Sequence, residues 1–214
     1  SGAVMDPKAL TELIPDWKEK EAPLNAPVSE DRFMILSETG ALKIPSVLLP
    51  ECFQNHGNYV VSLGNVVRWM GQQAEALGVE IFPGFAAAEV LFHEDGHVKG
   101  VATGDMGIGK DGQPTDHVTR GMELRAKYTL FAEGARGHLS KQLIARFKLD
   151  ADCDPQSYSI GIKELWQVPD ANFESGLTQH TFGWPLDNQT GGGSFMYHFG
   201  DNYIAIGFVV HLNY

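Results

Sequence analysis

Apolar positions recur at helical spacing in several stretches of this chain, two of which come before residue 80. Near the amino terminus they fall at i, i+3, i+4 and i+7 and share one face: Leu10, Leu13, Ile14 and Trp17. Asp6-Pro7 is a typical helix start, because Asp caps exposed amides and Pro is tolerated at the first helical position. Apolar residues within 63–77 share a second helical face, which Gly78 ends as a left-handed cap. Two amphipathic helices are therefore predicted.

Other stretches alternate apolar and polar residues with the period of a strand. Residues 18–50 carry short apolar runs and prolines, and they are read as hairpin strands and loops without chemistry. Further strands are predicted at 58–62, 79–82, 87–92, 98–103, 122–131, 158–168, 179–186, 192–199 and 203–210. The last four, with turns between them, predict an antiparallel sheet, and residues 104–119 predict an exposed hairpin loop. The fold class is α+β, with a mainly antiparallel sheet.

The stretch from Tyr128 to Leu143 is typical of a strand, a glycine-bracketed turn and a helix. Glycines bring the backbone close to a ligand, and the free amides of a first helical turn favour phosphate. An ordinary strand-to-helix connection gives the same pattern. Neither Gly-x-Gly-x-x-Gly nor a P-loop motif occurs in the chain, so the turn suggests a phosphate-bearing cofactor without defining one.

Gly191-Gly192-Gly193 opens one of the late strands. Such a run marks either a turn or bulge, or a place where a flat ring lies on bare backbone. Aromatic residues in the neighbouring strands suit a hydrophobic pocket in the second case. A side chain at either of the last two glycines is then expected to obstruct the pocket.

Composition limits the classes of function. The 214 residues are 43% hydrophobic and carry a formal net charge of −11, which argues against binding nucleic acid or anionic lipid electrostatically. Any membrane contact must be apolar, and no apolar run reaches the roughly 20 residues of a spanning helix. No close histidine pair predicts a metal site, and no Ser/His/Asp arrangement predicts a catalytic acid or base.

Several longer sequence motifs point to one family. They are Ser1-Gly2-Ala3-Val4-Met5-Asp6-Pro7, Pro15-Asp16-Trp17-Lys18-Glu19-Lys20, His56-Gly57-Asn58-Tyr59, Phe131 to Gln142, Gly161-Ile162-Lys163-Glu164-Leu165-Trp166, Gly183-Trp184-Pro185-Leu186 and Gly192-Gly193-Ser194-Phe195. In this order they resemble electron transfer flavoprotein-ubiquinone oxidoreductase, a membrane-associated enzyme with FAD and an iron-sulfur cluster. The resemblance covers essentially the whole chain.

The resemblance implies an internal piece of a longer oxidoreductase, inactive alone. The whole enzyme would pass electrons from reduced electron transfer flavoprotein through FAD and a 4Fe-4S cluster to ubiquinone. In the family the dinucleotide fingerprint precedes this piece, and the cluster cysteines follow it. The implied location is peripheral, on the inner membrane of a bacterium or a mitochondrion.

The resemblance also implies three regions. Residues 1–60 would form a membrane-facing helix and irregular hairpins. Residues 61–150 would form part of an FAD-binding, glutathione-reductase-like α/β domain with an inserted hairpin, and residues 151–214 an antiparallel quinone-binding sheet.

Site residues follow from the same resemblance. Glu133, Gly134 and Val90 are expected to contact FAD, through backbone and turn. Gly192 and Gly193 are expected to contact the ubiquinone headgroup. The bilayer contacts are expected at Leu10, Leu13, Ile14 and Trp17, although the same face would equally pack on the core.

Two alternatives stay open. A single-component flavin monooxygenase would carry a similar aromatic sheet and turn, and NADPH oxidation by the full-length protein would reveal it. A non-catalytic peripheral membrane module would bind no cofactor and would use Asp6 to Trp17 as its anchor. Liposome flotation and a flavin absorbance scan separate that case.

Overall fold

The computed structural model describes residues 2–212, which divide into two compact units. Of these residues, the first unit comprises 2–80 and 156–212, and the second comprises Ile81–Pro155. The second unit is thus inserted between two halves of the first. The region boundaries expected at residues 60 and 150 stay predictions.

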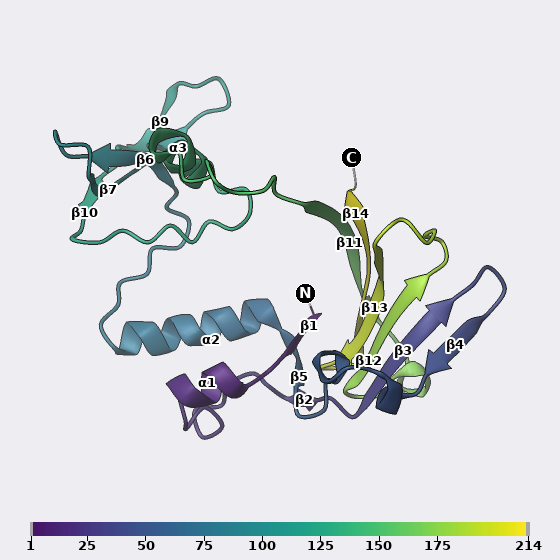
Figure 1. The fold of residues 1–214 in the computed structure, drawn as a ribbon. Coiled ribbons are helices and arrows are strands. Elements are labelled where there is room, and N and C mark those ends of the chain that lie inside the picture. Colours follow the sequence, from purple (N-terminus) through teal and green to yellow (C-terminus); the bar gives the residue numbers. More distant parts are fainter. Residues whose placement is uncertain (1, 213–214) are drawn as a thin grey trace. The chain divides into compact units, whose positions relative to one another are not determined.

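The first unit is built on a six-stranded sheet in the order β11-β14-β13-β12-β3-β4 (Figure 1). Its strands are β3 (Glu30–Leu36), β4 (Ala41–Ile44), β11 (Tyr158–Gln167), β12 (Leu177–Gly183), β13 (Gly192–Phe199) and β14 (Tyr203–Leu212). Neighbours among the four late strands pair antiparallel, which confirms the predicted antiparallel sheet. Gly200 and Asn202, both at positive φ, form the tight turn between β13 and β14.

One pairing in this sheet is parallel and was not predicted. β3 runs parallel to β12, with Leu177 opposite Glu30 and Gly183 opposite Leu36. A strand from the amino-terminal half therefore joins the late strands, and β4 extends the sheet as its hairpin partner. Segments read from the sequence as isolated hairpins thus belong to the central sheet.

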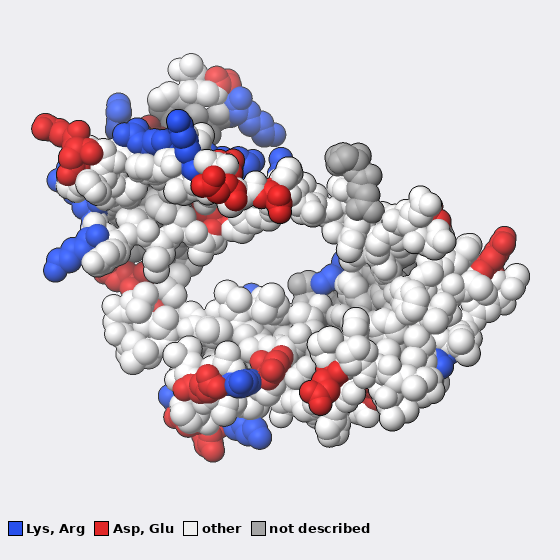
Figure 2. Space-filling model, in the orientation of Figure 1, with Lys and Arg blue, Asp and Glu red and all other residues white. Residues whose placement is uncertain are grey.

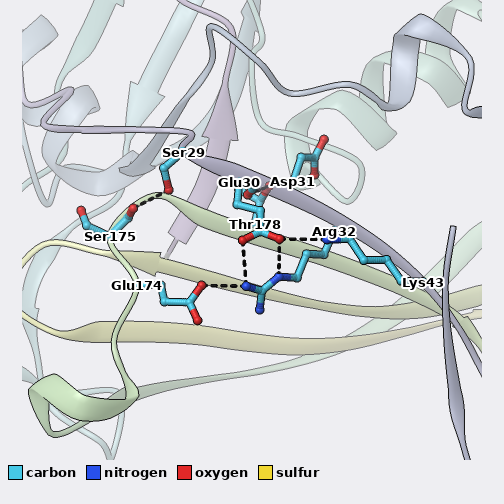
Figure 3. A network of polar contacts seen from close by, with 8 residues as sticks. All are labelled: Ser29, Glu30, Asp31, Arg32, Lys43, Glu174, Ser175 and Thr178. Carbon is cyan, nitrogen blue, oxygen red and sulfur yellow. Dashed lines mark hydrogen bonds and ion pairs between the residues drawn. The ribbon is translucent and has the colours of Figure 1, made fainter. Parts of the chain in front are cut away.

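Polar contacts hold β3 to the chain that leads into β12 (Figure 3). The Arg32 guanidinium donates to both carboxylate oxygens of Glu30 at 2.8 Å and to Glu174 at 2.8 Å. Lys43 on β4 donates to Glu30 at 2.9 Å. The Arg32 hydrogen bonds, followed by those of Lys43, lower the pKa of Glu30 from 4.5 to about 2.

A smaller sheet and two helices complete the first unit. The sheet has the order β1-β5-β2, and these elements are β1 (Gly2–Met5), β2 (Ala26–Pro27), β5 (Tyr59–Ser62), α1 (Lys8–Leu13) and α2 (Leu63–Ala76). Short 3-10 turns are η1 (Ser46–Leu48), η2 (Glu51–Phe53) and η3 (Asp170–Asn172). β5 is central to the packing, because Val61 contacts the helices and Val60 contacts Phe199 and Ala205 of the large sheet.

The second unit packs a helix on a small sheet. Its elements are β6 (Ala87–Phe92), β7 (Val98–Thr103), β8 (Met106–Ile108), β9 (Pro114–Thr119), β10 (Glu123–Arg125) and α3 (His138–Phe147). The sheet has the order β10-β7-β6, and β8 and β9 form a separate exposed hairpin. Val90, Leu139 and Leu143 form its buried core. The predicted 87–92/98–103 hairpin is confirmed.

Three local predictions are wrong. Residues 79–82 form no strand, and the strand expected at 122–131 shortens to β10, whose pairing with β7 spans only three residues. The helix at 63–77 is confirmed as α2, yet its buried residues are Val66 and Trp69, whereas Val67 and Leu77 of the predicted face are exposed. Apolar spacing finds the helix, but tertiary packing selects which of two overlapping stripes is buried.

Candidate functional site

The glycine pair at the start of β13 has backbone conformations that favour glycine. Gly192 has φ +143 and Gly193 has φ +156. A β-carbon at Gly193 would lie 2.0 Å from the Thr181 carbonyl oxygen, and one at Gly192 would lie 2.2 Å from the Val209 carbonyl oxygen. The neighbouring strands therefore require glycine here, whether or not a ligand binds.

A cleft of about 550 Å³ opens beside this glycine pair. Residues from the ends of β3 and β12 and from the loop before β13 line it, and they include Leu36, Phe182, Trp184, Leu186 and Gly192. Gly193 lies directly behind it, against the backbone of Thr181 and Phe182. The lining combines aromatic rings with bare main chain, which suits a flat apolar ring.

The same face of the sheet continues as an aromatic layer. The Phe33 ring lies 5.5 Å from Phe182 and 5.4 Å from Phe53, centroid to centroid. Phe195 and Tyr197 stack at 4.7 Å on the adjacent strand. Because side chains alternate across a strand, Phe195 and Tyr197 of β13 lie on one face of the sheet with Phe33 and Phe182 of the neighbouring strands. Phe53 of η2 packs on this face.

One hydrogen-bonded polar pair lies inside this layer. His180 Nε2 and the Tyr197 hydroxyl oxygen are 2.8 Å apart. Burial lowers the pKa of His180, which Asp31 partly opposes, and burial raises the pKa of Tyr197 to about 12. Both groups are therefore neutral near pH 7. His198, on the opposite face, accepts from the Glu174 amide and is structural.

In the second unit, Glu133 occupies the beginning of α3. Its carboxylate accepts hydrogen bonds from the Ser140 hydroxyl and amide, both at 2.6 Å, and from the Leu139 amide at 3.3 Å. The Ser140 hydroxyl hydrogen bond is the main cause that lowers the pKa of Glu133. The amides at the start of α3, which the sequence suggested for phosphate binding, thus already donate hydrogen bonds to the Glu133 carboxylate.

The other two residues expected at FAD differ in accessibility. Gly134 has φ +74, and a β-carbon there would meet no atom within 4 Å, so a ligand can approach this turn. The Val90 side chain is buried against Leu139 and Leu143, which leaves only its backbone for a ligand. Glu133 and Gly134 lie in the turn before α3, whereas Val90 of β6 packs against α3 itself.

The membrane face predicted at the amino terminus is mostly core. Leu10 and Trp17 are only 3% and 5% exposed, and Ile14 packs against their cluster. The Trp17 indole donates to the Thr11 hydroxyl at 3.0 Å. Leu13 alone of the four is well exposed, at 68%. Buried side chains cannot contact lipid, so this fold corrects the assignment for Leu10 and Trp17.

Exposed apolar residues lie instead on a segment for which the sequence suggested no role. Between β4 and η2, Val47 and Leu48 are 86% and 72% exposed, and Leu42 and Phe53 are also exposed. We call residues 41–53 the apolar segment. The Val-Leu-Leu run between Pro45 and Pro50 was a usable signal, because prolines hold such a run out of a regular sheet.

Charge is distributed unevenly over the visible face. Figure 2 shows few Lys, Arg, Asp or Glu side chains over the six-stranded sheet, and more over the unit that carries β6–β10 and α3. No described helix is long and apolar enough to cross a membrane. In the part of the chain that the structure describes, no group of three or more His, Cys, Asp or Glu residues is arranged to hold a metal ion.

Comparisons with known proteins agree with this geometry. A family model described as "ETF-QO, ubiquinone-binding" matches residues 158–214, the segment that contains β11 to β14. The chain is 60% identical to the mitochondrial electron transfer flavoprotein-ubiquinone oxidoreductase of Bos taurus, over 100% of this chain and 35% of that protein. It is 52% identical to the Pseudomonas aeruginosa protein of the same name, over 100% of this chain and 39% of that protein.

A solved structure shows a related fold. The crystal structure of a mutant of P. aeruginosa PqsL superposes with a TM-score of 0.51 at 16% identity, and the match covers 99% of this chain and 50% of that chain. At this identity the likeness concerns the fold alone.

The aromatic sheet and its glycine-lined cleft lie in a chain that is homologous to a class of oxidoreductases. The sequence comparisons specify which one. The chain belongs to the electron transfer flavoprotein-ubiquinone oxidoreductase family, and it spans about 35 to 39% of the length of the curated relatives cited here.

Proposed function

We propose that this chain forms the quinone-facing part of an enzyme that passes electrons from reduced electron transfer flavoprotein to ubiquinone. One observation carries the proposal: the strands matched by the ubiquinone-binding model supply the glycine pair and much of the lining of the 550 Å³ cleft. The ring of the quinone would lie on Gly192 and beside Phe182, and Gly193 would shape the backbone behind it.

Tryptophan fluorescence tests the cleft directly. Trp184 lines it and is 52% exposed, whereas Trp166 on β11 is 54% exposed and lies outside it. A short-chain ubiquinone analogue should quench wild-type fluorescence, and Trp184→Phe should lose that saturable quenching. Trp166→Phe is the matched control and should keep it. Equal quenching in both variants would place the quinone elsewhere.

We propose FAD as a cofactor of the full-length protein only. The open Gly134 turn fits a ligand that approaches the backbone, but the helix amides beside it are already paired with Glu133. The residues present therefore fit the phosphates of FAD poorly in this conformation. The 4Fe-4S cluster is likewise proposed for the full-length protein and is assigned to no residue here.

Membrane contact is proposed for the apolar segment, residues 41–53, with Leu13 as an additional exposed residue. The exposure of Val47 and Leu48 supports this placement. Leu48→Glu should lower flotation with liposomes, and Leu77→Glu is the control, because Leu77 is 86% exposed directly after α2. Equal flotation of both variants would argue against the segment. Attachment to an inner membrane, mitochondrial or bacterial, remains part of this proposal.

Neither alternative gains a specific observation. The module with an amino-terminal anchor required a lipid-facing Trp17, which the fold buries. The monooxygenase alternative shares the fold class, and the NADPH oxidation assay on the full-length protein still distinguishes it.

A further inference from the structure

His180 and Tyr197 form a neutral hydrogen-bonded pair inside the aromatic layer, where apolar side chains would pack equally well. The rings of His180 and Tyr197 are T-shaped at 5.4 Å, and their polar atoms are 2.8 Å apart. Phe33 and Phe195 flank the pair. A phenylalanine at either position would fit such surroundings with less cost of desolvation, so the polarity calls for a chemical explanation.

The pair lies next to the cleft along the strand. Phe182 lines the cleft, and His180 is two residues earlier on β12, on the same face of the sheet. Two residues of strand span about 7 Å. His180 does not line the cleft itself, so a quinone ring must extend from the cleft past Phe182 to bring one edge to His180.

The hydrogen bond also selects a tautomer. Burial keeps the Tyr197 proton on its oxygen to about pH 12, so the hydroxyl is a dependable donor. If it donates to Nε2, the single proton of a neutral imidazole lies on Nδ1. Among the described residues, the Tyr197 hydroxyl is the hydrogen-bond partner of the His180 ring, which leaves Nδ1–H available.

We propose that His180 donates the proton that one oxygen of the reduced quinone receives, and that Tyr197 is the positioning residue that keeps this proton on Nδ1. The inference rests on the proposed function, and it deepens that function by naming the proton donor at the same cleft.

The step balances as follows. The quinone takes two electrons from the reduced flavoprotein and two protons, and it becomes the quinol. Nδ1–H of His180 gives one proton to a quinone oxygen while Nε2 takes the Tyr197 hydroxyl proton, and a proton from solvent replaces the latter in the same relay, so that Tyr197 is neutral before and after the step. The second quinone oxygen takes its proton from solvent, and exchange with water restores the first tautomer.

The charged groups around the pair are few. Asp31 on β3 faces it and is itself held by the Thr178 hydroxyl at 2.9 Å and the Asn55 amide nitrogens at 2.9 and 3.0 Å. On the other side, Lys163 lies 5.1 Å above the Phe195 ring and donates to the Gly2 carbonyl. Asp31 is therefore the nearest charge that favours a positive imidazole.

The experiment uses the full-length protein with reduced electron transfer flavoprotein as donor and a short-chain ubiquinone as acceptor. Tyr197→Phe and His180→Gln should lower kcat about 10-fold and about 100-fold, with KM nearly unchanged, as for loss of a general acid. Reduction of ferricenium, which takes no proton, should be unaffected. Tyr128→Phe and His117→Gln are exposed controls in the other unit and should behave as wild type.

The pH profile separates a chemical role from a structural one. Without an internal donor, kcat for quinone in His180→Gln should fall as pH rises between about 6 and 9, more steeply than in wild type, because solvent must supply both protons. Unchanged quinone turnover in both variants would overturn the inference, and so would a parallel loss of ferricenium reduction. A wild-type protein that does not reduce quinone would instead refute the proposed function.

Discussion

Replacing Gly193 by alanine tests whether the sheet itself requires this glycine. The backbone at φ +156 is one that an L-residue rarely adopts, and the added methyl group would lie 2.0 Å from the Thr181 carbonyl oxygen. Strained backbone of this kind costs about 1–3 kcal/mol. Pushing β12 and β13 apart to relieve the contact costs about 1–3 kcal/mol more. We therefore expect Gly193→Ala to lower the free energy of unfolding by about 2–6 kcal/mol.

Urea denaturation followed by circular dichroism measures this loss. With an m-value of about 2 kcal/mol/M, the midpoint should fall by about 1–3 M. Gly64→Ala is the control, because a β-carbon at this helical glycine meets no atom within 4 Å. Its midpoint should stay unchanged or rise slightly, since alanine favours a helix.

A midpoint for Gly193→Ala within about 0.3 M of wild type would refute the reasoning. It would show that the strands relax cheaply around a side chain. If the loss is found, a Gly193→Val variant that fails to reduce quinone cannot be taken as evidence of ring contact. Variants of the cleft residues Phe182 and Trp184 then give the cleaner test of quinone binding.

Three further outcomes follow from the packing. Glu30→Gln should lower stability by only about 0.5–1 kcal/mol at pH 7, because the Glu30 side chain is 40% exposed. Because the pKa of Glu30 is lowered in the folded state, this stability difference from wild type is full above about pH 4.5 and fades as the pH falls toward 2. Thermal melts at several pH values measure it. Glu133→Gln should weaken the start of α3, seen as faster amide exchange in its first turn; unchanged exchange would contradict the capping role. Trp17→Ala should lower stability by about 3–5 kcal/mol, whereas Leu13→Ala should change it little, and equal effects in denaturant titrations would contradict the burial assigned here.

Local patterns in the sequence predicted the local parts of this fold. β11 to β14 follow one another in the chain, joined by the connections 168–176, 184–191 and 200–202, so alternation and turn residues were enough to find them. The parallel pairing of β3 with β12 joins residues far apart in the sequence, and no local pattern reports such a contact. The glycine pair was singled out correctly as unusual backbone, but its cause, the carbonyl groups of two neighbouring strands, required coordinates.

In the candidate site, too, local features were predicted from the sequence and long-range contacts were not. Apolar spacing found the helix with Leu10 and Trp17 but could not tell lipid from protein as the partner of its face. The His180–Tyr197 pair was missed, because a contact between residues of two strands can be predicted only when the register of those strands is known. Exposure of the apolar segment was also missed, because the run with Val47 and Leu48 was read as a strand or loop and the two flanking prolines were not used as a signal.

The parallel pairing of β3 with β12 has a consequence for the order of folding during synthesis. Roughly 150 residues separate the two strands, and a ribosome adds about 5–20 residues per second, so β3 and β4 must wait roughly 7–30 seconds for their partner. The whole of Ile81–Pro155 emerges in that interval and is free to fold first. A nascent chain stalled before β12 should therefore expose the apolar faces of the unpaired β3–β4 hairpin. A chaperone is expected to bind the chain in this interval.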